Sequence, residues 1–70
     1  MINTFRFLVV DSSLVERIII RSHLLKLNYS VDMASDIKTA SELILIRPYN
    51  FILLDKYLDN DLVVMNLSHT

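Results

Sequence analysis

The stretch Phe51-Ile52-Leu53-Leu54-Asp55-Lys56-Tyr57 (FILLDKY) joins four apolar residues directly to an aspartate. A short, continuous apolar run of this kind is typical of a parallel strand that is covered on both faces. Residues 7–10 (FLVV) repeat the arrangement, because they run into Asp11 and then into Ser12 and Ser13. We therefore expect two central strands, residues 5–10 and 51–54, that each end on a carboxylate.

A first helix is predicted directly after Asp11. Ser13, with Glu16 three residues later, forms a capping box, and apolar residues at helical spacing follow it. The helix is expected to run to about Leu27. Asn28 is expected to end it in the left-handed conformation, since the chain contains no glycine to take that role.

A second helix is predicted between residues 35 and 47. Ser35 or Asp36 can cap it, and Pro48 forces it to stop just after Arg47. Its apolar stripe consists of Ile37, Ala40, Leu43 and Ile44.

The fold class follows from the order of these elements. Residues 29–33 alternate between apolar and polar side chains, which is typical of an edge strand. The crossovers are long enough for parallel pairing, so we expect residues 1–70 to form a single three-layer α/β domain with strand order 2-1-3. Asp11 and Asp55 would then lie side by side at the carboxyl edge of the sheet, where open α/β sheets bind ligands.

Composition excludes several classes of function. A net charge of -1 and a pI near 6.0 provide no basic surface, so we expect no direct binding to nucleic acid. The chain has no cysteine, and its longest apolar runs are far shorter than the roughly 20 residues of a membrane span. We therefore expect a cytoplasmic protein without membrane contact.

Two neighbouring aspartates have a specific chemistry. Their charges repel, so a cation is expected between them, and carboxylate oxygens with sites left for water suit Mg²⁺. An aspartate beside such a metal can act as a nucleophile toward a phosphoryl group. The alternative for each aspartate is that it only ends a strand and caps the next turn.

The other polar residues have simpler interpretations. Ser12 and Ser13 are expected to cap rather than to attack, because the pattern places no base beside them. His23 is expected at the surface of the first helix rather than in phosphotransfer. The remaining aspartates are interpreted as a solvated edge residue, a helix cap and two loop residues, in the order Asp32, Asp36, Asp59 and Asp61.

In combination, VVDSS and LLDKY resemble motifs of the receiver domain of response regulators, the phosphoacceptor module of two-component signalling. The likeness covers nearly all of this chain and somewhat over half of a receiver domain, whose fold is flavodoxin-like. It implies that Asp55 is the phosphoacceptor and that Asp11 helps to hold Mg²⁺. It also implies that the backbone carbonyl of Tyr57 is the third protein ligand, and that a histidine kinase or another signalling protein is the partner.

The chain departs from the receiver pattern in three respects. The proline and glycine that the family has beyond the acceptor are missing from residues 58–64 (LDNDLVV). Ser12 stands where the family has a second acidic residue, and the hydroxyl residue and lysine that respond to phosphorylation have no counterparts. Two hypotheses follow. The first is a phosphoacceptor in phosphorelay signalling, without enzymatic turnover. The second is a degenerate interaction module that forms a homodimer or binds a signalling partner through an open sheet edge.

The third predicted strand, residues 51–54, would lie at an edge of the sheet. In a 2-1-3 sheet, residues 51–54 would form an exposed apolar edge, which proteins normally cover or pair. We expect the chain to dimerise, to bind a partner, to cover the edge with residues 62–67, or to be part of a longer protein. Residues 62–67 themselves could form a short strand or begin a third helix.

Overall fold

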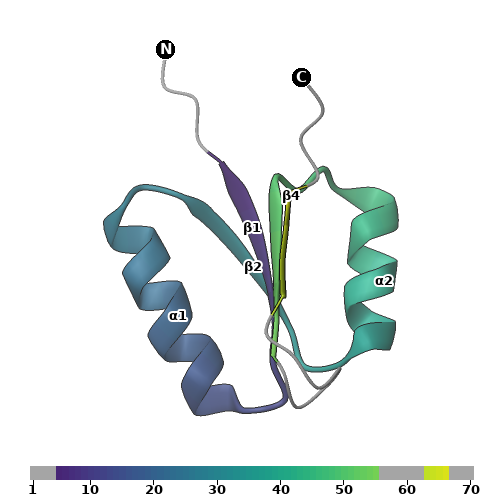
Figure 1. Cartoon of the computed structure of the whole chain (residues 1–70), viewed down its shortest axis with the longest axis horizontal. Helices are drawn as coiled ribbons and strands as arrows, with labels where there is room; N and C mark the ends of the chain where they lie inside the picture. Colours follow the sequence, from purple (N-terminus) through teal and green to yellow (C-terminus); the bar gives the residue numbers. More distant parts are fainter. Residues whose placement is uncertain (1–4, 56–62, 67–70) are drawn as a thin grey trace.

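The computed structural model describes residues 5–55 and 63–66 of the chain. The elements are β1 (Arg6–Val10), α1 (Leu14–Lys26), β2 (Ser30–Ala34), α2 (Ile37–Ile46), β3 (Phe51–Leu54) and β4 (Val63–Asn66). They form one sheet of order β2-β1-β3-β4, in which the first three strands are parallel. The sheet lies between α1 and α2, one helix on each side (Figure 1). The predicted three-layer α/β fold with strand order 2-1-3 is confirmed.

β1 is apolar throughout its second half because it is buried on both faces. Leu8, Val9 and Val10 have no solvent exposure. Leu8 and Val10 belong to a core cluster with Ile52 and with Ala40 of α2. Successive side chains of a strand point to opposite faces, so Val9 fills the face that α1 covers.

Both helices begin at the predicted caps. The hydroxyl of Ser13 accepts the backbone N–H of Glu16 at 3.3 Å, and Asn28 follows α1 with a φ of 66°. Asp36 rather than Ser35 caps α2, since its carboxylate accepts the N–H of Thr39 at 2.8 Å. This hydrogen bond lowers the pKa of Asp36. The local sequence patterns thus place both helix starts at the same end of the sheet (Figure 1).

β4 covers the edge of β3. It pairs with β3 in the antiparallel direction, with Leu54 opposite Val63 and Phe51 opposite Asn66. Of the four solutions expected for that edge, the structure shows the one in which a strand covers it, formed by Val63–Asn66 within the predicted run. The backbone groups of β3 are therefore paired on both sides, with β1 and with β4.

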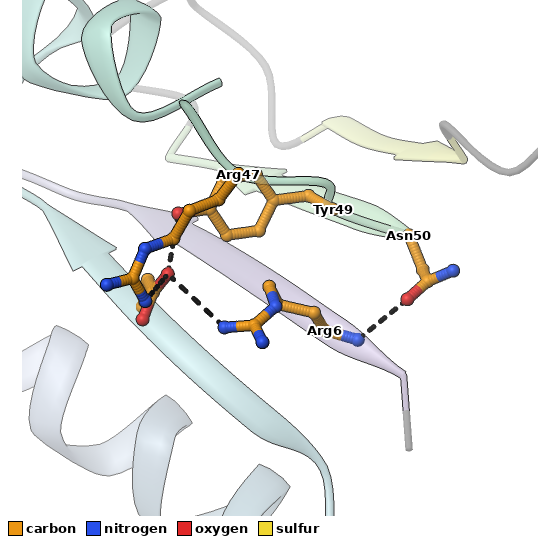
Figure 2. A network of polar contacts seen from close by, with 5 residues as sticks. Arg6, Arg47, Tyr49 and Asn50 are labelled. Atoms are coloured by element: carbon orange, nitrogen blue, oxygen red, sulfur yellow. Dashed lines mark hydrogen bonds and ion pairs between the residues drawn. The ribbon is translucent and has the colours of Figure 1, made fainter. Parts of the chain in front are cut away.

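Asp32 lies in the edge strand β2, as the alternating pattern predicted, but its side chain is partly buried and bonded rather than simply solvated. Its Oδ2 accepts the hydroxyl hydrogen of Tyr49 at 2.6 Å and lies 3.4 Å from Arg47 and 3.9 Å from Arg6 (Figure 2). The backbone N–H of Arg6 also donates to the side chain of Asn50 at 2.8 Å (Figure 2). These contacts attach the connection between α2 and β3 to the two strands β1 and β2. The sequence could not predict these contacts, because residues 47 and 49 are distant in sequence and leave no local pattern around residue 32.

This network predicts a pH dependence at high pH. Burial, and then the hydrogen bond to Asp32, raise the pKa of Tyr49 from 10.0 to about 12. The folded chain thus holds this proton more tightly than the unfolded chain, so the contribution to stability is complete below pH 10 and is lost as pH rises to about 12.

Urea unfolding measured between pH 9 and 12 checks the Tyr49 prediction. The wild type should lose more stability than Tyr49→Phe between pH 10 and about 12, because the variant has no hydroxyl to ionise. Equal losses in the two proteins would show that Tyr49 does not cause the effect.

Candidate functional site

Asp11 is fixed at the carboxyl end of β1. It is 3% exposed, and its backbone N–H donates to the carbonyl of Ala34 at 3.0 Å, which continues the β1–β2 ladder. Its Oδ1 accepts the N–H of Ser13 at 2.8 Å, and its carbonyl oxygen accepts from the guanidinium of Arg17. Contacts on both sides of Asp11 and at its carboxylate therefore hold the residue in place.

Asp55 lies beside Asp11 because their strands pair in register. Val10 is opposite Leu54, and the N–H of Asp55 donates to the carbonyl of Val10 at 2.9 Å. Asp55 is 8% exposed. The structure thus brings together the two aspartates that the strand pattern predicted at one edge.

Glu16 joins this pair, which the sequence did not predict. One carboxylate oxygen from each of Asp11, Glu16 and Asp55 lies within 4.8 Å of the others. In a complete capping box the glutamate side chain would accept the N–H of the capping serine. Here Asp11 accepts that N–H of Ser13, and the carboxylate of Glu16 lies near the two aspartates.

The three carboxylates form what we call the acidic site. Two of its members are buried, where the interaction between like charges is stronger than in water, and Glu16 is exposed. All three side chains offer oxygen ligands, which is the donor set that Mg²⁺ and Ca²⁺ prefer. The residues present therefore fit a hard divalent cation at the carboxyl edge of the sheet.

The other predicted residues contribute no carboxylate to the acidic site, or they lie outside the described residues. Tyr57, whose carbonyl was expected as a ligand, lies outside them, as do Asp59 and Asp61. Ser12 and His23 are exposed, and Ser13 is the α1 cap as expected.

Within residues 5–55 and 63–66, neither helix is long and apolar enough to cross a membrane. Comparisons with protein-family models, with curated proteins and with solved structures find no match. A proposal of function for this chain therefore depends on its own residues.

Proposed function

We propose that this chain is a receiver-type signalling domain in which Asp55 accepts a phosphoryl group beside a bound Mg²⁺. The observation that supports the proposal is the acidic site, in which Asp11, Glu16 and Asp55 share one edge of a parallel sheet. Its position after β1 and β3 agrees with the resemblance to receiver domains in the motifs around Asp11 and Asp55.

Each carboxylate has a separate role in the proposal. An oxygen of Asp55 attacks the phosphorus of the donor, the bond from phosphorus to the leaving group breaks, and the leaving group keeps the electron pair. Asp11 and Glu16 would hold the cation, and the resemblance to receiver domains implies the backbone carbonyl of Tyr57 as a further ligand. A bound Mg²⁺ offsets the negative charge of the incoming phosphoryl group.

Glu16 can replace the carboxylate that is missing at position 12. A serine in place of the second acidic residue removes one negative charge next to Asp11. Glu16 returns a carboxylate to the same site from the first turn of α1. We therefore assign to Glu16 the metal-binding role that Ser12 cannot perform.

The proposed role implies a phosphodonor as partner. A histidine kinase or a small phosphodonor would supply the phosphoryl group, and the chain would act in the cytoplasm. Each phosphorylation converts the Asp55 carboxylate into an acyl phosphate, so the proposal includes no enzymatic turnover.

The intact mass of the chain after incubation with Mg²⁺ and acetyl phosphate tests this function. We expect one phosphoryl group on the wild type, none on Asp55→Asn, and none on the wild type when a chelator removes Mg²⁺. Asp36→Asn is the matched control, because Asp36 caps α2 and is not part of the acidic site. It should be phosphorylated like the wild type.

Two outcomes would contradict the phosphoacceptor role. One is a folded wild-type chain that gains no phosphoryl group. The other is a phosphoryl group that persists in Asp55→Asn, which would place the modification on another residue.

A second candidate function is an interaction module that keeps the fold without the chemistry. An open edge of β3 does not support this function, because β4 pairs with that edge. The observation that now favours it is the exposure of large apolar side chains on the helices, most of all Leu45, which is 85% exposed. A folded chain that binds no Mg²⁺ and accepts no phosphoryl group would favour this second function.

A further inference from the structure

α1 is held to the sheet less firmly than α2. None of its 13 residues is buried, and its most enclosed apolar residues, Ile20 and Leu24, are only half-buried. α2, by contrast, places Ala40 in the core cluster, and Leu43 packs against that cluster. A helix with few buried apolar contacts opens locally at a lower free energy than the core strands. We therefore expect α1 to open more easily than the central strand β1.

The start of α1 is attached to the end of β1 by polar contacts. The guanidinium of Arg17 donates to the backbone carbonyl of Asp11, and the backbone N–H of Ser13 donates to the carboxylate of Asp11. Both contacts therefore end on the same residue. Glu16 lies in the same turn of the helix, with a carboxylate oxygen within 4.8 Å of those of Asp11 and Asp55.

The acidic site takes its three carboxylates from three different places in the fold. Asp11 follows β1, Asp55 follows β3, and Glu16 belongs to α1 itself. Movement of α1 away from the sheet would therefore remove one of the three ligands. A cation that binds the complete site more tightly than the site without Glu16 shifts the equilibrium toward the attached helix.

We propose that Glu16 clamps α1 to the sheet when a divalent cation occupies the acidic site. The inference rests on the cation site of the proposed function, and it adds that binding controls the attachment of a helix. The position of the third carboxylate is what makes the clamp. A carboxylate at position 12 would lie before the first residue of α1, Leu14, whereas Glu16 is part of the helix and moves with it.

Amide hydrogen exchange of the full chain, in MgCl₂ and in NaCl of equal ionic strength, tests the clamp. Without Mg²⁺, the amides of α1 should exchange faster than those of β1. Saturating Mg²⁺ should slow the α1 amides of the wild type by about tenfold or more, which is within the usual range of coupling between two equilibria. In Glu16→Gln most of this slowing should be lost, because the side chain no longer offers a carboxylate to the cation.

Glu42→Gln is the matched control. It makes the same chemical change at an exposed position of α2, away from the three carboxylates of the acidic site. Mg²⁺ should slow the α1 amides of this variant as it does in the wild type. Circular dichroism should show that both variants are folded.

Three results would overturn the clamp. The first is equal slowing of the α1 amides in the wild type and in Glu16→Gln. The second is a wild type whose α1 amides do not respond to Mg²⁺. The third is α1 amides that exchange no faster than those of β1 without Mg²⁺, since α1 would then open only when the whole chain unfolds.

The phosphorylation experiment separates a failure of the clamp from a failure of the proposed function. A chain that gains a phosphoryl group on Asp55, but shows no slowing that depends on Glu16, would lose the clamp and keep the phosphoacceptor role. A folded chain that shows neither result would contradict both proposals.

Discussion

Leu8→Ala is expected to lower the free energy of unfolding by about 2–5 kcal/mol. Leu8 has no solvent exposure, lies in the middle of β1, and pairs with Asp32 on one side and with Ile52 on the other. Its side chain is part of the core cluster on the α2 face. The truncation removes buried methyl groups and leaves a cavity that the strands on both sides of β1 prevent from closing.

The effect should be large compared with the total stability. A domain of 70 residues has a free energy of unfolding of roughly 4–10 kcal/mol, so this change removes a large part of it. Urea unfolding followed by circular dichroism measures the loss. Leu45→Ala is the matched control, because Leu45 is 85% exposed and its truncation should change stability by only about 0.5 kcal/mol. Similar losses in the two variants would show that Leu8 is not in the core.

Mg²⁺ is expected to stabilise the wild type strongly and Asp11→Asn very little. A ligand that binds only the folded state adds about 2.7 kcal/mol at a concentration of one hundred times its dissociation constant. Asp11→Asn keeps the size of the side chain but removes one of the two buried charges of the acidic site. Most of the stabilisation should therefore disappear in the variant.

Thermal and urea unfolding with MgCl₂, compared with NaCl of equal ionic strength, measure this difference. Asp36→Asn serves as the control, because its aspartate lies at the start of α2 and should leave the Mg²⁺ effect intact. If all three proteins gained the same stability from MgCl₂, the cation would be acting through general ionic strength and not at the acidic site.

The arrangement of the first three strands could be predicted from the sequence. Continuous apolar runs at residues 7–10 and 51–54 indicate strands buried on both faces, and the alternating run near Asp32 indicates an edge. Right-handed parallel crossovers then leave one order of strands. Asp11 and Asp55 come together for the same reason, since each follows the last residue of a paired central strand.

Glu16 and Asp32 could not be predicted in the same way. A capping box gives Glu16 a complete local explanation, and only the structure shows that Asp11 has taken the N–H of Ser13. Asp32 is a polar residue in an alternating strand pattern. Its partners Arg47 and Tyr49 lie in the connection between α2 and β3. In both cases a contact from outside the local pattern determines where the carboxylate lies.

β4 illustrates a third limit of sequence patterns. A short apolar run such as residues 62–67 is compatible with a strand or with the start of a helix. The pairing with β3 decides between them, because a strand in this place satisfies backbone groups that would otherwise form an open edge.

Titration of the ¹⁵N-labelled chain with Mg²⁺, followed by amide chemical shifts, tests most directly whether Asp11, Glu16 and Asp55 form one cation site. We predict that the largest shifts occur at residues 11–16 and at Asp55, and that they saturate together with a single dissociation constant. Asp32 and Asp36 should change little, because neither belongs to the acidic site. Equal small shifts at all acidic residues, or the absence of shifts at Asp11 and Asp55, would contradict a specific Mg²⁺ site at the carboxyl edge of the sheet.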